Sequence, residues 1–358
     1  MRPLIATVNL AAIRHNYLLA KSKAQCPQAF AVVKANAYGH GVREVVTVLG
    51  DVADGFAVAC LEEAAEVRGM HSTARILLLE GCFEPVEVVQ SAALGLDIVV
   101  QGEEQVRWLL DTPLERPINV WMALDSGMHR LGFDLEGIQQ WFAVLRNCPW
   151  VKELNLRSHF STADESAHPK TQQQADVFVA LSGVAFDQRS LANSAAVLTL
   201  GDTHHDWVRP GIILYGASPF AEHNAHELGL QAAMTLTAQV ISLRTIPAGE
   251  TVGYGAIWKA ERETRIATIC CGYADGYPRT APAGTPVVVN GQRAPLVGRV
   301  SMDMLTVDVT DVADVTVGSS VELWGEHVTV DEVAQACGTL GYELLTRVTA
   351  RVHRQYSH

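Results

Sequence analysis

The chain has 358 residues, 48% of them apolar, so it can bury a large core or more than one. Its 27 basic and 39 acidic residues give a formal net charge of −12. This charge argues against a nucleic-acid surface, which needs a basic stripe, and against binding to an anionic membrane. An anionic ligand would need specific basic groups against this background.

The cysteines and the hydrophobic pattern predict a cytoplasmic protein. The seven cysteines are odd in number, and no two have the C-x-x-C spacing of a metal or redox site. Reduced and mostly buried thiols are the expected state. The first 16 residues lack the long apolar segment of a secretory signal, and the sequence has no apolar run of 18 residues that could span a membrane.

In chain order, a short extended start comes first, and Asn9 can then cap a helix over residues 10–23. Short apolar runs follow, most of them succeeded by a helical stretch. Strands that alternate with helices predict a parallel sheet, and eight units in roughly 220 residues favour a (β/α)8 barrel over an open sheet. The expected strands are 30–33, 55–59, 75–79, 96–100, 118–124, 153–157, 189–192 and 212–215. The expected helices are 42–49, 61–68, 85–93, 103–110, 135–146 and 170–182.

The pattern changes after about residue 220. β-rich runs now follow one another, broken by turn residues, and Asn290-Gly291 between two such runs is a strong hairpin signal. We therefore predict an α/β TIM barrel over residues 1–225 and a mostly β C-terminal domain over residues 226–358. The expected strands are 234–246, 265–271, 286–290, 294–300, 304–309 and 320–324, with helices near 331–336 and 342–347.

Lys34 follows the buried run of residues 30–33 and is the first candidate for chemistry. A lysine at the end of a buried strand is costly unless it is paired, shifted in pKa or covalently used. It can be an activated amine that forms a Schiff base with a carbonyl, or a lysine that reaches from the strand end to solvent. The spacing alone leaves both interpretations open. The adjacent His204 and His205 point apart on a strand and have no third ligand at a suitable spacing, so we predict no metal site.

Residues 30–41, FAVVKANAYGHG, resemble the pyridoxal-phosphate lysine motif of the alanine racemases, and further motifs match that family along nearly the whole chain. The resemblance implies a fold-type III enzyme that uses pyridoxal 5′-phosphate to interconvert L- and D-alanine, which supplies D-alanine for peptidoglycan. It also implies a homodimer.

The resemblance assigns cofactor-binding residues through the contexts KANAYGHG, SHF, ANS, VRPGIILYG and GYEL. Lys34 bonds the cofactor, and Arg209 donates a hydrogen bond to its pyridine nitrogen. Because arginine stays protonated, that nitrogen stays unprotonated and the ring is a weaker electron sink, which suits a proton exchange. The residues implied for the phosphate are Tyr38, Ser194, Gly211, Ile212 and Tyr342.

Two acid/base residues are implied, one for each face of the substrate α-carbon. Lys34 serves one face, and Tyr254 of the VGYG motif serves the other from the partner subunit of a head-to-tail dimer. Tyrosine titrates near ~10, so a positive neighbour is needed to lower its pKa. In the family this tyrosine lies in a network with the residues matched by His159 and Arg209.

The resemblance also implies substrate contacts. Arg130 contacts the substrate carboxylate, Tyr273 of GYADGYPR forms a gate, and Met302 of VSMDM reaches the substrate through its backbone. Asp303 is a candidate lining residue of the entrance.

One position departs from the family pattern. Relatives usually carry a lysine, often carbamylated, at the position of Ala123, and its negative charge orients the arginine matched by Arg130. Alanine supplies no charge. Some relatives combine an uncharged residue with a bound chloride, so our hypothesis is that an anion or water fills this space.

Three other functions remain as alternatives. A decarboxylase of a basic amino acid shares the barrel-plus-β architecture, but it is expected to place a carboxylate at the ring nitrogen, where VRPG offers arginine. A non-catalytic pyridoxal-phosphate carrier usually lacks the β domain. A racemase of broader specificity, for example for serine, is the third.

Overall fold

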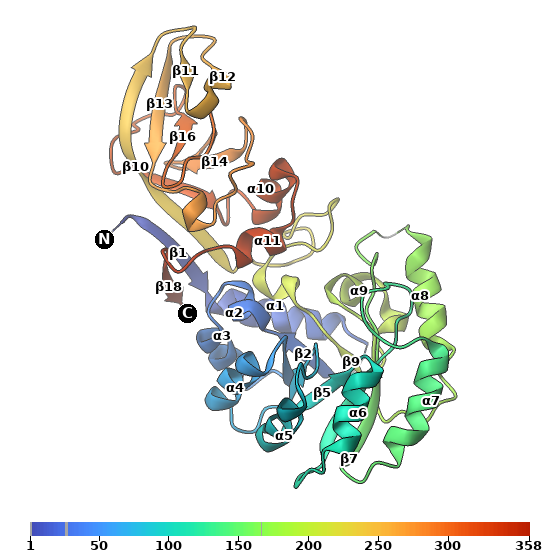
Figure 1. Ribbon diagram of the computed structural model, residues 1–358. Helices are drawn as coiled ribbons and strands as arrows, with labels where there is room; N and C mark the ends of the chain where they lie inside the picture. Colours follow the sequence, from blue (N-terminus) through green and yellow to red (C-terminus); the bar gives the residue numbers. More distant parts are fainter. Residues whose placement is uncertain (1, 26–27, 166) are drawn as a thin grey trace. The chain divides into compact units, whose positions relative to one another are not determined.

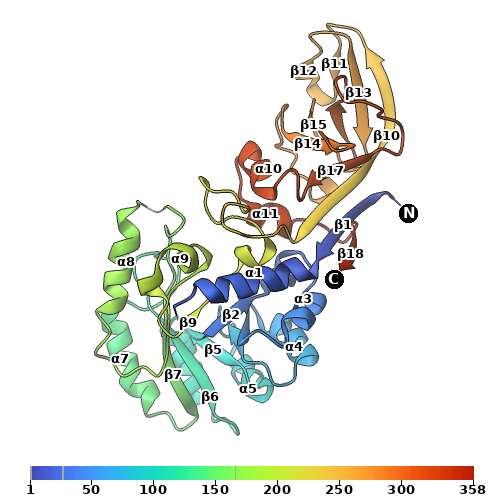
Figure 2. The same ribbon diagram turned by 180° about the vertical axis from the view of Figure 1, so that it is seen from behind.

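A computed structural model describes residues 2–25, 28–165 and 167–358 (Figures 1 and 2), so Cys26 lies outside the described residues. By its internal contacts the chain forms two compact units. The barrel unit comprises Arg14–Ala37 and Gly41–Leu214. The β unit comprises the chain up to Ile13, Tyr38–His40 and Tyr215–His358. The domain boundary at residues 225 and 226 stays a prediction.

The barrel unit contains a closed parallel barrel, as the alternating pattern predicts. Eight strands among the described residues pair in the order β2 to β9, and β9 pairs with β2 to close the ring. Their apolar side chains are buried because helices cover the outside of the ring. The strands are β2 (Gln28–Val32), β3 (Gly55–Val58), β4 (Ile76–Leu78), β5 (Asp97–Val100), β6 (Ile118–Ala123), β7 (Val151–Arg157), β8 (Arg189–Ser190) and β9 (Trp207–Val208).

The helices follow the predicted ranges closely. The Asn9 side chain accepts a hydrogen bond from the N–H of Ala12 at 3.0 Å, which confirms the predicted cap of the first helix. The helices are α1 (Leu10–Lys23), α2 (Lys34–Tyr38), α3 (Val42–Leu49), α4 (Leu61–Met70), α5 (Pro85–Leu94), α6 (Glu103–Asp111), α7 (Leu135–Arg146), α8 (Pro169–Val179), α9 (Ser194–Thr199) and η1 (Gly201–Thr203).

The last barrel strand lies earlier than predicted. The prediction of a strand at residues 212–215 is wrong, because that run is the 3-10 helix η2 (Ile212–Tyr215). The strand is β9, and its Trp207 ring stacks on Phe30 of β2 with centroids 3.9 Å apart. Pro210 lies two residues beyond the end of β9, and because proline has no N–H to continue a strand ladder, the strand ends before it.

The β unit is mostly antiparallel, as predicted. Its main sheet has the strand order β15-β14-β17-β10-β1-β18, and β13 pairs with β10 and β16. Asn290 and Gly291 have φ angles of 49° and 79° and form the two-residue turn between β14 and β15, which confirms the hairpin. The elements are β1 (Leu4–Asn9), β10 (Met234–Ile246), β11 (Thr251–Val252), η3 (Tyr254–Ala256), β12 (Trp258–Lys259), β13 (Thr264–Ile269), η4 (Tyr273–Asp275), β14 (Pro286–Val289), β15 (Gln292–Pro295), β16 (Leu305–Asp308), β17 (Ser320–Trp324), α10 (Val330–Cys337), α11 (Gly341–Thr346) and β18 (His353–Ser357).

The extended start of the chain is a full member of this sheet. β1 pairs antiparallel with β10, where Leu4 is opposite Ala238, and parallel with β18, where Ile5 is opposite His353. Both chain ends therefore complete the β unit.

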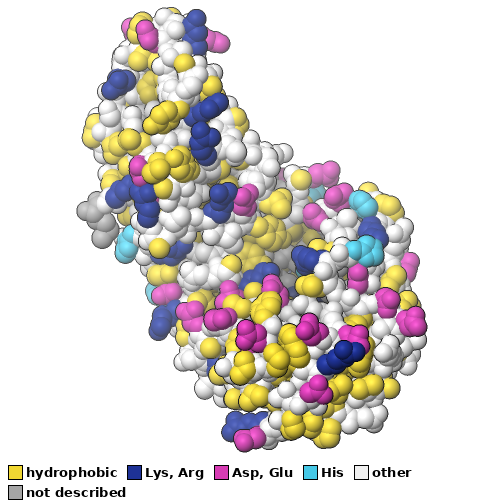
Figure 3. All heavy atoms as spheres, viewed as in Figure 1, with side chains coloured by type: hydrophobic (Ala, Val, Ile, Leu, Met, Phe, Trp, Pro, Cys, Tyr) yellow, Lys and Arg dark blue, Asp and Glu magenta, His cyan; other side chains and the backbone are white. Residues whose placement is uncertain are grey.

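The surface carries the acidic balance of the composition. The face in Figure 3 shows acidic side chains scattered over the barrel unit among apolar ones. In the part of the chain that the structure describes, no helix combines the length and hydrophobicity of a membrane span.

Candidate active site

Lys34 lies two residues beyond the end of β2, at the carboxyl end of the barrel. The three residues after it, Ala35 to Ala37, have φ angles of 52° to 54°, a left-handed turn that is strained for residues with a side chain. Hydrogen bonds hold this turn: Glu63 accepts the N–H of Ala35 at 2.7 Å, and Asn36 accepts the N–H of Val42 at 2.8 Å. Strained backbone that is held so firmly is typical of a functional site.

Burial lowers the pKa of the Lys34 amine below its usual value. The Glu80 carboxylate raises it, whereas the guanidinium groups of Arg130 and Arg157 lower it further. Lys34 is only partly exposed. These surroundings favour the neutral, nucleophilic amine over a lysine that reaches into solvent.

His159 and Arg209 lie in the same cluster of charged groups. Burial, and then the positive charge of Arg209, lowers the pKa of His159 far below its usual value, so the imidazole is neutral. Burial also lowers the pKa of Arg209.

The Arg209 side chain is 4% exposed and tightly bonded. It donates hydrogen bonds to the carbonyls of Ser158 at 2.6 Å and Leu191 at 3.1 Å, and also to the hydroxyl of Ser190. The guanidinium is thus fixed between the ends of β7, β8 and β9.

Ser194 and Gly211 meet where the last two strands end. The Ser194 hydroxyl oxygen accepts the N–H of Gly211 at 2.8 Å, so its hydrogen can be donated to another acceptor. Both residues are buried, and so is Ile212 at the start of η2. A hydroxyl beside glycine backbone near the last strands is a suitable cradle for a phosphate group.

The charges fit an anionic cofactor. Lys34, Arg130, Arg157 and Arg209 face one another across this end of the barrel, with Glu63 and Glu80 as the carboxylates near Lys34. The Glu63 oxygens are occupied by the backbone N–H groups of Ala35 and Ala59. The surplus positive charge suits a phosphate and a carboxylate.

Ala123 ends β6 and is 4% exposed. Its carbonyl accepts the N–H of Phe133 at 2.8 Å, which closes the loop that carries Arg130. Arg130 is exposed in the single chain. The hypothesis of an anion or water beside Ala123 stays a prediction.

In the β unit, aromatic stacking fixes Tyr38. Its ring centroid is 4.8 Å from that of Tyr215 and 6.0 Å from that of Tyr342, so two of the residues implied for the phosphate lie side by side. Burial raises the pKa of the Tyr38 phenol, which therefore remains a hydrogen-bond donor. A Cβ on Gly39 would lie 2.2 Å from the carbonyl oxygen of Leu345, so only glycine allows this close approach.

The other implied residues of the β unit are exposed. Tyr254 is 69% exposed in a turn between Gly253 and Gly255, and Met302 is 53% exposed. The N–H of Tyr273 donates to the carbonyl of Ser301 at 3.0 Å, so the turns that carry Tyr273 and Met302 lie side by side.

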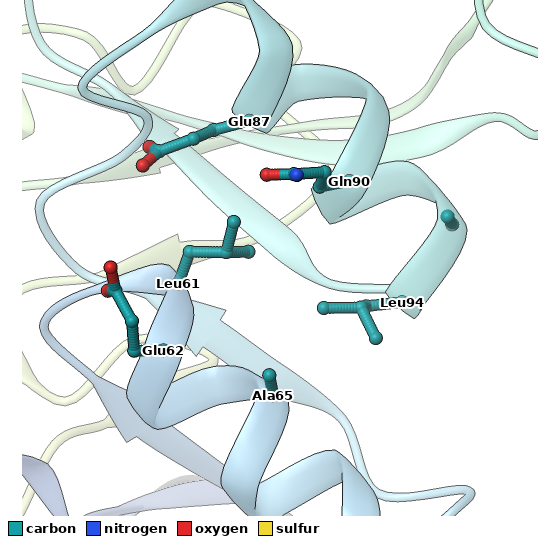
Figure 4. Close-up of a pocket in the computed structure, with 7 residues that line it drawn as sticks. Leu61, Glu62, Ala65, Glu87, Gln90 and Leu94 are labelled. Carbon is teal, nitrogen blue, oxygen red and sulfur yellow. The ribbon is translucent and has the colours of Figure 1, made fainter.

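A surface groove elsewhere does not suit an anion. It has a volume of about 450 Å³ between α4 and α5 (Figure 4). Its lining contains carboxylates and no cation: Leu61, Glu62, Ala65, Glu87, Gln90, Ala93 and Leu94. The two adjacent histidines have different surroundings: the His204 ring bonds the N–H of Gln25 and the carbonyl of Ala196, and the His205 ring lies 4.9 Å from that of Phe178.

A (β/α)8 barrel that carries an activated lysine, fixed arginines and a serine–glycine cradle defines a barrel enzyme for an anionic ligand. Residues 8–219 match the family described as alanine racemase, N-terminal domain, and residues 233–356 match alanine racemase, C-terminal domain. The chain belongs to the alanine racemase family.

Relatives match over the full length. The biosynthetic alanine racemase of Pseudomonas aeruginosa is 65% identical over 100% of both chains, and its crystal structure superposes with a TM-score of 0.99. The alanine racemase of Vibrio cholerae is 47% identical over 99% of both chains. The Bartonella henselae alanine racemase, whose structure has covalently bound pyridoxal phosphate, is 31% identical over 100% of both chains with a TM-score of 0.91.

Arg157 was not among the residues predicted from sequence, although it lies in the charged cluster. No family motif marked it. The available signal was the predicted strand of residues 153–157, ELNLR, in which polar residues alternate with leucines.

Proposed function

We propose that the chain interconverts L-alanine and D-alanine with pyridoxal 5′-phosphate as cofactor, in the cytoplasm, and that its D-alanine supplies peptidoglycan. The position of Lys34 at the carboxyl end of the barrel is the observation that carries this proposal, since burial there lowers the pKa of its amine. Full-length similarity to alanine racemases supports it.

When bound, pyridoxal phosphate would supply an aldehyde with which an amine can condense and a ring that withdraws electrons from the substrate α-carbon. Lys34 would hold it covalently, and Arg209 would donate to its ring nitrogen. The residues that would bind its phosphate are Tyr38, Ser194, Gly211, Ile212 and Tyr342. His159 lies beside Lys34 and Arg209 and, as a neutral imidazole, can relay a hydrogen bond between cofactor and protein.

Two side chains would move the α-proton. Lys34 Nζ takes or returns it on one face, and Tyr254 Oη acts on the other. Arg130 would hold the substrate carboxylate, while Met302 and Tyr273 would border the substrate. Fixing the carboxylate leaves the α-carbon between the two bases.

We further propose a homodimer in which Tyr254 of the partner subunit completes each barrel site. The support for this homodimer is a group of exposed apolar side chains in the β unit, which we call the gate surface. It consists of Tyr254, Ile257, Tyr273, Met302 and Met304, which are 38% to 69% exposed.

The reaction is tested by incubating L-alanine with the protein in heavy water. Chiral chromatography follows D-alanine, and mass spectrometry follows deuterium at the α-carbon. We expect wild type to form deuterated D-alanine, and Tyr254→Phe to lose this product while Tyr356→Phe, the control, retains it. Absence of D-alanine with wild type would refute the racemase and direct attention to lysine, ornithine and serine as substrates.

The composite site is tested by mixing two inactive variants. Lys34→Ala and Tyr254→Phe each lack one base in both sites of a homodimer. A mixed dimer has one site with both bases intact, so exchange of subunits should restore about a quarter of wild-type activity. If both bases came from one subunit, mixing would restore nothing.

A further inference from the structure

The side chains of alternate residues on β6 and β7 point into the barrel. Glu153 of β7 bonds Arg75 at 2.7 Å, and the Arg75 guanidinium lies over the rings of Trp121 of β6 and Trp207 of β9. Because β7 and β8 lie between β6 and β9, one guanidinium can reach both of these rings only inside the barrel. Since side chains alternate along a strand, Arg157 of β7 faces the same interior as Glu153, and Ala123 of β6 faces the same interior as Trp121.

The Arg157 side chain extends from β7 across the barrel interior. It pairs in register with Ala123, so the two side chains are neighbours on the interior face. Its Nη1 donates to the carbonyl of Leu79, directly after β4, at 2.8 Å. Because β5 and β6 lie between β4 and β7, the guanidinium spans the barrel interior. The methyl group of Ala123 leaves room for it.

The guanidinium also has an unused donor. Its Nε is buried and has no hydrogen-bond partner within the described residues. Burial, and then the charge of Arg130, lowers the pKa of Arg157 to about 10, which still leaves the group charged near neutrality. A buried charge of this kind is costly, so its retention calls for a function.

We propose that Arg157 is a positioning residue for the reaction: its side chain fills the barrel interior beside Ala123 and holds a fixed positive charge facing Lys34. The inference rests on the proposed role of Lys34 as the reacting amine. The charged groups that act on that amine are Glu80 after β4, Arg130 after β6, Glu63 on α4 and Arg157 on β7, and the neutral His159 also lies within electrostatic reach of it. Without Arg157, the two carboxylates would act against one cation fewer, and the amine would hold its proton more firmly.

The charge is tested in the cofactor-free full-length protein, where racemisation plays no part. The measurement is the reaction of Lys34 with trinitrobenzenesulfonate against pH, read at that residue by peptide mass spectrometry. Arg157→Met keeps the length and removes the charge, and should move the midpoint to higher pH by about 0.5–1 unit. Arg157→Lys should keep the wild-type midpoint. Arg189→Met is the matched control, since the Arg189 guanidinium also donates to backbone carbonyls, and it should not move the midpoint. An unchanged midpoint in Arg157→Met overturns the charge role.

The packing is tested by a double-mutant cycle of Ala123→Leu and Arg157→Ala, read as thermal stability. Each single change should destabilise, one by crowding and one by leaving a void, and the double variant should lose less than their sum. Additive losses would overturn the packing role. Activity that rises with chloride in an otherwise halide-free buffer would also overturn it, because an anion would then occupy the space beside Ala123.

Discussion

Arg209 donates a hydrogen bond to the backbone carbonyl of Ser158 at 2.6 Å and thereby ties the end of β9 to the end of β7. Lysine cannot reproduce the planar fork that also reaches Leu191 and Ser190. We expect Arg209→Lys to lower the free energy of unfolding by about 2 kcal/mol, measured by urea denaturation. Arg107→Lys, in an exposed pair with Glu103, should cost less than about 0.5 kcal/mol. Equal losses in the two variants would contradict a structural role for the Arg209 fork.

Ser194→Ala tests the phosphate cradle. It removes the hydroxyl that accepts the Gly211 N–H and that would donate to the phosphate. Because hydrogen bonds to charged groups contribute about 1.5–3 kcal/mol, the affinity for pyridoxal phosphate should fall about 10- to 100-fold. The measurement is titration of the cofactor-free protein, followed by its absorbance near ~420 nm. Ser22→Ala, at an exposed position, is the control. An unchanged affinity in Ser194→Ala would contradict a role for Ser194 in binding the phosphate.

Local patterns predicted most of the fold. The helix over residues 10–23 and the helix over residues 42–49 begin and end as expected, because caps and periodicity are local signals. β9 was missed since two residues are too short to show periodicity, and its apolar neighbour 212–215 is buried without being a strand. The pairing of β1 with β10 joins residues more than 220 positions apart, and no local pattern encodes it.

The candidate site was predictable where motifs mark it. Lys34, Ser194 and Arg209 follow barrel strands, as predicted. The hydrogen bond from the Gly211 N–H to the Ser194 hydroxyl is consistent with both residues belonging to one phosphate-binding cradle. Arg157 was missed because its importance comes from the register between β6 and β7 and from a side chain that reaches β4. Neither the strand register nor this long-range hydrogen bond can be predicted from residues that are close in the sequence.

Lys34→Met should stabilise the cofactor-free protein at neutral pH. Burial lowers the pKa of Lys34 in the folded state, whereas an unfolded lysine titrates near ~10.4. Between these two values the unfolded state binds more protons, so the free energy of unfolding of wild type rises with pH. Methionine removes this dependence. The gain, measured by urea denaturation, should be clear at pH 7 and small at pH 10. Lys152→Met, at an exposed position, should show no such trend, and a gain independent of pH would refute the explanation by charge.

Asp331→Asn should stabilise the β unit at neutral pH. Burial raises the pKa of the Asp331 carboxyl to about 6, despite the hydrogen bond at 2.8 Å that it accepts from the N–H of Ser218. An unfolded aspartate titrates near ~3.9, so between these values the folded state binds more protons and stability falls as pH rises. Asparagine can still accept the Ser218 N–H without burying a charge.

We expect the Asp331→Asn variant to gain about 1–2 kcal/mol at pH 7.5 and nothing at pH 3.5, measured by thermal and urea denaturation. The loss of a negative charge from the first turn of α10 works against this gain by about 0.3–1 kcal/mol. Glu332→Gln, in the same turn and ion-paired with Arg293 at the surface, removes the same helix charge without relieving burial, so it should show no gain. If both variants lost stability equally at pH 7.5, the helix charge would outweigh the burial of Asp331.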